Sequence, residues 1–541
     1  MRRSHARNRV ENKPNSPDMD PVKPQIRPLN RSGNLISRNS KQIKSPLLVT
    51  AASLAALLVF LLCCYLFFSA RPYYNPGGSR RYGIVIDGGS TGTRIYVFSY
   101  RVGGGSPVFD FGQKFLETSM KVNPGLSAYA EDQDNAGGSL VELVEFAKGK
   151  VPKELWRETE IRLMATAGLR LLELSAQERI LDACRRVLRS SGFKFRDEWA
   201  SVISGSDEGI YAWVVANYAL GTLGGDPLKT TGIIELGGAS AQVTFVSTEP
   251  MPPEFSHTVE FGNVTYNLYS HSFLHFGQNV AYQSLRQLLI SGDLNSAAES
   301  LHKGIYIDPC TPKGYLPGSG SWKFSPGSSD EKNKYISNLQ AGGNFSECRS
   351  AALMMLQKGN DKCFFEHCKV GSVFVPKLQG KFLATENFFH TYKFFELRPR
   401  AFLSDLMMAG EQFCGEEWSK LKRKHHSLDE EDLVHYCFSS AYILALLSDS
   451  LGIALDDERI RVANQVGDIR LDWPLGAFIL QSTANMDVNH PDWISTIIND
   501  DSPTLLIVMF TAWSASKCRK PHLKTIYDLE KGRYIVTRIS R

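Results

Sequence analysis

The chain has 541 residues, which is too long for a single hydrophobic core, so its length predicts two lobes with smaller additions. Its formal net charge is +5, but eleven lysines and arginines stand against three acidic residues before residue 47, so the basic excess lies in the N-terminal arm. Because the remainder is near neutral to slightly acidic, the charge argues against a nucleic-acid-binding protein.

The N-terminal end joins this basic arm to an apolar run. Residues 1–46 are rich in Pro, Asn and Ser, which predicts a disordered tail. Residues 47–70 contain no charged side chain, and these 24 residues suffice for a membrane-spanning helix, which needs about 20. The alternative is a cleaved signal peptide, which the length of the run and of the arm before it disfavours.

The charges around the apolar run predict its orientation. Lys and Arg are in excess on its N-terminal side, so that side is expected to face the cytosol. The run would then be the signal anchor of a single-pass type II membrane protein, with residues 71–80 as a short stalk. The rest of the chain would lie in a lumen of the secretory pathway, such as the Golgi, or outside the cell.

A glycine-rich hairpin is predicted directly after the stalk. The apolar run from Gly83 to Ile86 ends in Asp87, and the loop Gly88-Gly89-Ser90-Thr91-Gly92 leads into a second apolar run. Glycines let backbone N–H groups turn inward to bind an anion, above all phosphate. Asp87 stands where a hard cation bound to that phosphate would need an oxygen ligand. Taken alone, the stretch fits an ordinary hairpin equally well.

A second stretch repeats this plan. The apolar run Gly232-Ile233-Ile234 ends in Glu235, and Leu236-Gly237-Gly238-Ala239-Ser240 leads into another apolar run. Two acid-plus-glycine hairpins predict two similar lobes that face each other across a cleft and bind parts of one polyphosphate. Neither stretch matches a Walker loop or a dinucleotide-binding fingerprint.

Two further candidates lie between the hairpins. Thr166 follows the apolar run Ile161–Met164, at a strand end where a cleft residue is expected. Glu208 precedes the apolar run 210–218, which places it in the first turn of a helix. A carboxylate there is ordinarily explained by the helix dipole. Hydrolysis of a phosphate also needs a proton acceptor beside an in-line water, which makes Glu208 a candidate base.

The cysteines indicate an oxidising compartment. Six of them lie between residues 310 and 437, which predicts a disulfide-stapled region. A zinc site is the alternative, but the paired Cys-x-x-Cys spacing is absent. Glycosylation sequons begin at Asn263 and Asn344, on the side expected to be lumenal. Cys184 lies on the apolar face of a predicted helix and is expected to be a buried free thiol.

The C-terminal end contains a shorter apolar stretch. Residues 504–513 would cross only about half a bilayer. A buried or interfacial segment is therefore preferred there, with a short second membrane segment near 504–516 as the alternative.

Five segments of the chain, in order, resemble the signature segments of the nucleoside-triphosphate diphosphohydrolase, or apyrase, family, which lies within the actin and sugar-kinase superfamily. The details are most similar to membrane-bound plant members. The segments are Asp87 to Arg94, Ala165 to Arg170, Ser204 to Tyr218, Glu235 to Gln242, and Asp472 to Gly476.

The resemblance implies an α/β fold of two actin-like, RNase H-like lobes with a cleft between them, preceded by the transmembrane helix. Catalytic lobe I would comprise residues 81–205 with about 466–500, lobe II would comprise residues 206–465, and residues 501–541 would form a C-terminal segment. Proximity and the resemblance together imply the disulfides Cys310–Cys348, Cys363–Cys368 and Cys414–Cys437.

The resemblance also implies roles in the cleft. Glu208 would be the general base, and Ser240 and Gln242 would hold the attacking water, while Thr166 would orient that water or contact phosphate. Asp87 and Glu235 would anchor Ca²⁺ or Mg²⁺, through metal-bound waters, although the family usually has Asp where this chain has Glu235. Trp473 would pack behind the site, as a core aromatic or with a direct role. The backbone amides of the two loops would bind the phosphates, from Gly89, Ser90, Thr91, Gly92, Gly237, Gly238, Ala239 and Ser240.

The predicted function is that of an apyrase, which cleaves terminal phosphates from nucleoside tri- and diphosphates with a divalent cation and a base-activated water. The alternatives are a Golgi-type nucleoside diphosphatase, a non-catalytic nucleotide-binding scaffold and a phosphotransferase of the sugar-kinase type. Ser240 and Gln242, as holders of a water, argue against the phosphotransferase. The expected partners are the nucleotide substrate and the membrane, whereas the sequence indicates no oligomeric state.

Overall fold

The structure is a computed structural model. It describes Val59 and residues 80–103, 106–109, 118–291, 306–316, 339–358, 362–365, 368–487, 523–528 and 533–538. The chain divides into two compact units, Met1–Tyr73 and Tyr74–Arg541. The predicted tail 1–46, the stalk up to residue 79, the segment 504–516 and, apart from Val59, the predicted membrane run 47–70 lie outside the described residues. None of the described helices combines the length and the apolar character needed to cross a membrane.

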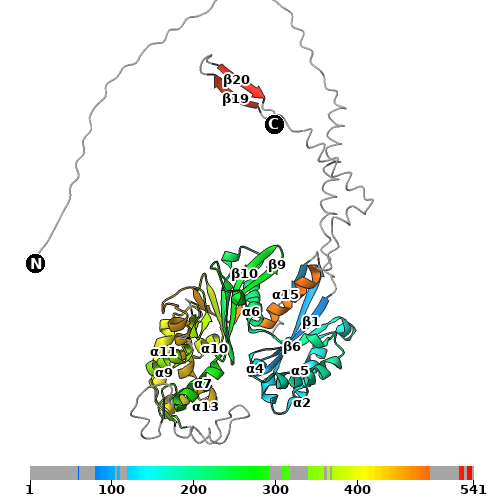
Figure 1. The fold of residues 1–541 in the computed structure, drawn as a ribbon. Coiled ribbons are helices and arrows are strands. Elements are labelled where there is room, and N and C mark those ends of the chain that lie inside the picture. The colour runs from blue at the N-terminus through cyan, green and yellow to red at the C-terminus, as the bar shows by residue number, and fades with distance from the viewer. Residues whose placement is uncertain are drawn as a thin grey trace, which may run out of the picture. The chain divides into compact units, whose positions relative to one another are not determined.

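The first sheet of the larger unit is built on the first glycine hairpin (Figure 1). Its central strands are β1 (Arg80–Gly88) and β2 (Thr93–Gly103), which pair antiparallel, and β5 (Glu160–Ala165), which runs parallel to β1. The remaining strands are β3 (Ser106–Phe109), β4 (Ser119–Val122) and β6 (Ala200–Val202). The strand order is β3-β2-β1-β5-β6, and β4 pairs with β2.

Alternating residues of β1 face two different layers, as the period of a strand requires. Ile84 and Ile86 are buried against a layer of helices that contains α2 (Gln133–Ala136), α3 (Val141–Lys150) and α5 (Leu174–Arg189). Val85 is buried on the opposite side, in a cluster with α6 (Gly205–Ala219) and α15 (Trp473–Asp487). A short helix, α4 (Ala167–Arg170), follows β5.

The second sheet is built on the second glycine hairpin. Its order is β16 (Ile460–Val462), β15 (Phe382–Glu386), β7 (Gly232–Leu236), β8 (Ser240–Val246), β10 (Val264–Leu274) and β9 (Ser256–Phe261). The β7–β8 pair is antiparallel, and β15 runs parallel to β7. The structure therefore repeats in the second sheet the strand–loop–strand plan of the first.

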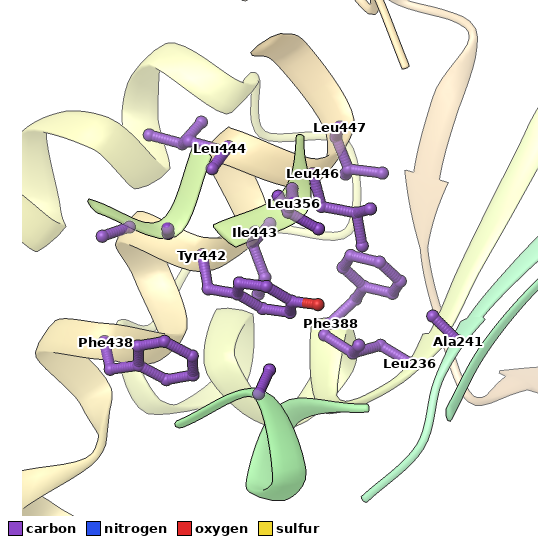
Figure 2. Packing of buried hydrophobic residues seen from close by; sticks show 14 of the residues in the cluster. Leu236, Ala241, Leu356, Phe388, Phe438, Tyr442, Ile443, Leu444, Leu446 and Leu447 are labelled. Atoms are coloured by element: carbon purple, nitrogen blue, oxygen red, sulfur yellow. The ribbon is translucent and has the colours of Figure 1, made fainter. Parts of the chain in front are cut away.

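A large core covers one face of the second sheet. Figure 2 shows Phe388 and Tyr442 in this core near Leu236 of β7, and both aromatic side chains are completely buried. Its helices are α7 (Gln278–Ser291), α9 (Phe345–Leu356), α10 (Asn387–Phe394), α11 (Leu403–Gly415), α12 (Trp418–Lys424), α13 (Glu430–Val434) and α14 (Tyr436–Leu444), the last continued by a π-helical turn at Ala445–Ser450. Short pairs complete the fold: β11 (Tyr306–Asp308) with β12 (Leu339–Ala341), β13 (Cys368–Val370) with β14 (Val373–Phe374), β17 (Gln465–Val466) with β18 (Ile469–Arg470), and β19 (Leu523–Asp528) with β20 (Arg533–Arg538).

Three disulfides staple this helical region. They join Cys310 to Cys348, Cys363 to Cys368 and Cys414 to Cys437, which confirms the predicted pairing. Cys184 is buried in α5 and is free, as predicted.

Helices α6 and α15 fill the space between the two sheets, because their common core contains Val85 of β1 as well as Ile233 of β7 and Leu268 of β10 (Figure 1). The two helices approach each other so closely that a Cβ atom on Gly476 would overlap the backbone carbonyl of Tyr211. Only glycine fits this crossing, since a backbone group cannot move aside as a flexible side chain can.

We expect Gly476→Ala to lower the free energy of unfolding by about 1–3 kcal/mol, the usual result of adding a methyl group to a filled core. Chemical denaturation of the purified protein measures this change. Gly149→Ala is the matched control, because Gly149 is an exposed glycine of α3 with open space around its Cβ position. That change should raise stability by about 0.4–1 kcal/mol. A Gly476→Ala protein as stable as wild type would show that the crossing is looser than described.

Candidate active site

A cleft between the two hairpin loops brings together every residue that the sequence analysis placed in the site. Its space, counted out to the open mouth, is about 730 Å³. The predicted residues that line it are Asp87, Gly89, Ser90, Thr91, Gly92, Thr166, Glu208, Glu235, Gly237, Gly238, Ala239, Ser240 and Gln242.

The two loops approach within contact distance of each other. A Cβ atom on Gly238 would lie 2.9 Å from Ser90 Oγ and 3.1 Å from Thr91 Cγ2. Among the described residues, no hydrogen bond uses the backbone N–H groups of residues 89–92 or those of Gly238 and Ala239. Each loop therefore offers unpaired N–H donors, the arrangement that binds phosphate oxygens.

The second loop is fixed from behind. The carbonyl oxygens of Gly237 and Gly238 accept hydrogen bonds of 2.9 and 3.0 Å from the backbone N–H groups of Gln278 and Asn279, where α7 begins. The N–H of Gly237 donates to the Ser240 carbonyl at 3.0 Å. Because its carbonyl groups are held by α7, the loop keeps one shape and its N–H groups stay available.

The first loop is held by the segment that contains Thr166. The backbone N–H of Thr166 donates to the Gly88 carbonyl at 3.2 Å, and the Thr166 hydroxyl lies 3.5 Å from the same oxygen. A Cβ atom on Gly168 would come within 2.8 Å of the Cα atom of Ser90, so α4 packs directly on the loop. Thr166 is almost completely buried and lines the cleft beside this loop.

Glu208 lies in the first turn of α6, as predicted, and only 8% of it is exposed. Ser204 caps the start of the helix, because its hydroxyl accepts a hydrogen bond from the N–H of Asp207. Gly209 permits α6 to lie on β8, because a Cβ atom there would overlap Thr244 Oγ1 and lie 3.4 Å from Gln242 Cβ. This packing brings Glu208 beside Gln242.

Arg170 is the ionic partner of Glu208, with Nη2 at 2.5 Å from Oε2. Burial raises the pKa of Glu208 above its ordinary value, and the charge of Arg170 and hydrogen bonds from Arg170 and Gln242 oppose that rise. A buried carboxylate with a raised pKa and a cationic partner is suited to accept a proton.

Gln242 links the base to the second loop. Its Nε2 donates to Ser240 Oγ at 2.7 Å and to Ser272 Oγ at 3.2 Å, and both Ser240 and Gln242 are buried. Ser240, Gln242 and Glu208 therefore form one polar group next to the unpaired N–H donors of the loop. Such a group can hold and deprotonate a water molecule.

Asp87 and Glu235 carry carboxylate oxygens without partners. Asp87 Oδ1 and Glu235 Oε2 are buried and make no hydrogen bond to the described residues. Burial raises the pKa of Asp87, nearby Glu208 adds to the rise, and the charge of Arg94 opposes it. Burial likewise raises the pKa of Glu235, reinforced by Glu208 and Glu386. The buried negative charge and the orphaned oxygens fit a hard divalent cation.

The cleft contains residues that the sequence analysis did not assign to it: Glu386, Asp472, Lys121 and Tyr96. The sequence held one signal, because Glu386 also follows an apolar strand, like Asp87 and Glu235. Asp472 stood in the fifth signature segment without a role. Lys121 was not predictable from local sequence, because it reaches the cleft through the pairing of Lys121 with Arg94 between β4 and β2.

Trp473 lines the cleft and is also nearly buried, so it is both a residue of the cleft and a core aromatic. Its ring stacks with that of Tyr211, with centroids 6.2 Å apart. Among the described residues, no three Asp, Glu, His or Cys side chains converge closely enough to hold a metal ion directly. A cation at Asp87 and Glu235 would accordingly be held through waters, as the resemblance implies.

The fold and the cleft define a two-sheet α/β protein in which two glycine loops face each other across a cleft lined by carboxylates. Comparison with known proteins identifies the family: the chain belongs to the GDA1/CD39 (nucleoside phosphatase) family, which matches residues 76–491. The family predicted from the five segments is thereby confirmed.

Individual relatives agree with this assignment. Probable apyrase 6 of Arabidopsis thaliana is 60% identical over 560 residues, which cover 100% of both chains. Ectonucleoside triphosphate diphosphohydrolase 3 of Mus musculus is 30% identical, over 83% of this chain and 86% of that one. The fold is similar to the crystal structure of nucleoside triphosphate hydrolases from Neospora caninum, with a TM-score of 0.54 at 17% identity, over 75% of this chain and 93% of that one.

We expect Glu235→Gln to stabilise the cation-free protein at pH 7, by about 0.5–2 kcal/mol. The pKa of Glu235 is raised in the folded state, so the folded protein binds its proton more tightly than the unfolded chain and the ionised group opposes folding at neutral pH. The gain should shrink as the pH falls and the folded carboxylate becomes protonated. Denaturation in a chelator at pH 7 and pH 5 measures both effects.

The control for this change is Glu260→Gln, an exposed carboxylate of β9, which should alter stability little at either pH. A Glu235→Gln protein that is less stable than wild type at pH 7 would contradict the electrostatic interpretation.

Proposed function

We propose that this protein is an apyrase, which hydrolyses terminal phosphates of nucleoside tri- and diphosphates. The observation that carries the proposal is the position of Glu208, Gln242 and Ser240 beside two facing loops, most of whose N–H groups make no hydrogen bond to the described residues. The family is one of nucleoside phosphatases, and its relatives are named as apyrases and triphosphate diphosphohydrolases.

The chemistry needs no covalent intermediate. The N–H groups of residues 89–92 and of Gly238 and Ala239 hold the phosphates, while Ser240 and Gln242 hold the water. Glu208 takes the proton of that water as it attacks the terminal phosphorus, and Arg170 keeps the carboxylate ionised and in place. The bond from that phosphorus to the bridging oxygen breaks, so inorganic phosphate forms and the shortened nucleotide leaves with the bridging oxygen. Thr166, fixed to the first loop, helps to orient the attacked phosphate.

A divalent cation, Ca²⁺ or Mg²⁺, belongs to this proposal. Asp87 and Glu235 would hold it through waters, since each has a buried oxygen without a partner. The bound cation neutralises charge on the phosphoryl oxygens. The cleft needs such neutralisation, because five carboxylates line it together with only two cationic side chains, those of Arg94 and Lys121.

We further propose that the two sheets are the cores of actin-like lobes, and that residues 47–70 anchor them on the lumenal or outer side of a membrane. The three disulfides support an oxidising compartment. Both sequons are accessible: Asn263 lies in the exposed turn between β9 and β10, and Asn344 is an exposed residue before α9.

A Golgi-type nucleoside diphosphatase is the nearest alternative within the class. A panel of nucleoside tri- and diphosphates, assayed for phosphate release with Ca²⁺ and with Mg²⁺, distinguishes the two. Comparable rates on both substrate types fit an apyrase, whereas activity on diphosphates alone fits the alternative.

We expect Glu208→Gln to lower kcat for phosphate release by about 10²–10⁴-fold, because the variant lacks the proton acceptor but keeps the shape of the side chain. Nucleotide binding should persist. Asp207→Asn is the control in the same helical turn, and its activity should stay within a few fold of wild type. Equal, near-zero rates for wild type and Glu208→Gln would instead favour the non-catalytic scaffold.

We expect Arg170→Gln to move the acidic limb of the pH profile of kcat/KM to higher pH. Arg170 lowers the pKa of Glu208, so its removal raises that pKa, and the base then loses its proton only at higher pH. The profile is measured at saturating cation. If the limb stays where it is while the rate falls uniformly, Arg170 acts on the substrate rather than through Glu208.

A further inference from the structure

Glu386 is the last residue of β15, and its backbone has a conformation that residues other than glycine rarely adopt. Its φ is +60° and its ψ is −118°. In a regular strand it would point away from the cleft, because Thr385 is paired with Glu235 and successive residues face opposite sides of a sheet. Ala384, two residues earlier, is buried in the core on the far side. Glu386 nevertheless lines the cleft.

Two asparagines hold this turn of the backbone. The N–H of Glu386 donates to Asn464 Oδ1 at 2.7 Å. Asn387 Nδ2 donates to the carbonyl of Leu236, the residue after Glu235, at 2.8 Å. Unfavourable backbone conformations persist only where the surroundings enforce them, and they concentrate at functional sites.

Asn464 also connects Glu386 to Asp472. Its carbonyl accepts a hydrogen bond of 2.9 Å from the N–H of Leu471, the neighbour of Asp472. Asp472 is 7% exposed, and its Oδ2 makes no hydrogen bond to the described residues, although Arg470 Nε lies 3.2 Å away. One residue therefore positions two carboxylates of the cleft.

The carboxylate of Glu386 makes no ion pair of 4.0 Å or less with the described part of the chain. The cationic side chains near the cleft balance only part of this charge, because Arg170 is paired with Glu208, Arg470 with Asp472, and Arg94 donates to Tyr96 at 2.9 Å. Burial raises the pKa of Glu386, and Asp472 adds to the rise. Glu235 and Asp472, each more than nine-tenths buried, likewise have an oxygen without a hydrogen bond.

We propose that Glu386 and Asp472 form a second carboxylate pair which, with Asp87 and Glu235, binds the water shell of a divalent cation before the nucleotide arrives. This inference rests on the proposed cation-dependent hydrolysis and adds two carboxylates that contact the cation's waters, together with an order of binding. These carboxylates contact the ion through its waters, so they favour a hydrated divalent cation by their charge, whether it is Ca²⁺ or Mg²⁺. The second pair therefore raises affinity for both cations.

The test measures cation binding to the nucleotide-free, full-length protein. Isothermal titration with CaCl₂ and with MgCl₂ gives the Kd, and the Ca²⁺-induced rise in Tm checks it. We expect Glu386→Gln and Asp472→Asn each to weaken Ca²⁺ binding about three- to tenfold, with a comparable effect on Mg²⁺ binding. Glu396→Gln is the matched control, because Glu396 also has a positive φ, of 57°, but is exposed and does not line the cleft.

Hydrolysis then separates this inference from the proposed function. In Glu386→Gln, higher Ca²⁺ should restore phosphate release, so that the half-saturating Ca²⁺ concentration rises while kcat changes little. Unchanged Ca²⁺ affinity in both variants, or no Ca²⁺ binding by the nucleotide-free wild type, would overturn the inference and leave the hydrolase intact. Hydrolysis by wild type in excess chelator would instead refute the cation dependence itself. Denaturation in chelator checks that each variant is folded.

Discussion

The close approach of α6 to its neighbours is the constraint on which the site depends. Gly209 lets the first turn of the helix lie against β8, and Gly476 of α15 lets the other side of α6 meet a second helix at backbone contact. Between these two contacts the helix has no freedom to shift. The packing of α6 therefore places Glu208 beside Gln242. Hydrogen bonds then set the orientation of the Glu208 carboxylate.

The same packing concentrates negative charge. Five carboxylates line one cleft, and burial raises the pKa of Asp87, Glu208, Glu235 and Glu386. A fold selected for stability alone would replace some of these groups with neutral ones. Their presence is explained if a cation and an anionic substrate enter together. The cation then balances the charge of the buried carboxylates, and the substrate balances the charge of the cation. The buried carboxylates therefore lower the stability of the cation-free protein and at the same time favour the binding of a cation.

Much of the cleft was predictable because its parts are local in sequence. Asp87 and Glu235 each end an apolar strand before a glycine loop, Glu208 begins a helix, and the three disulfides follow from cysteine proximity and the family resemblance. Glu386 was missed because the alternation of β15 would turn it away, and only one unusual φ angle brings it back. Lys121 depends on the pairing of β4 with β2, which no local pattern encodes. The anchor at 47–70 and the lobe boundaries stay predictions.

Helix α15 covers one face of the first sheet, yet nearly 390 residues separate it from Gly83, beside which Phe478 packs. During synthesis the strands of that sheet leave the ribosome long before the helix that shields them. The apolar surface that α15 covers in the folded protein therefore lacks this helix while the second sheet and its disulfide-linked helices are synthesised. A chain that ends before residue 473 would therefore lack one of the two helices that pack against both sheets.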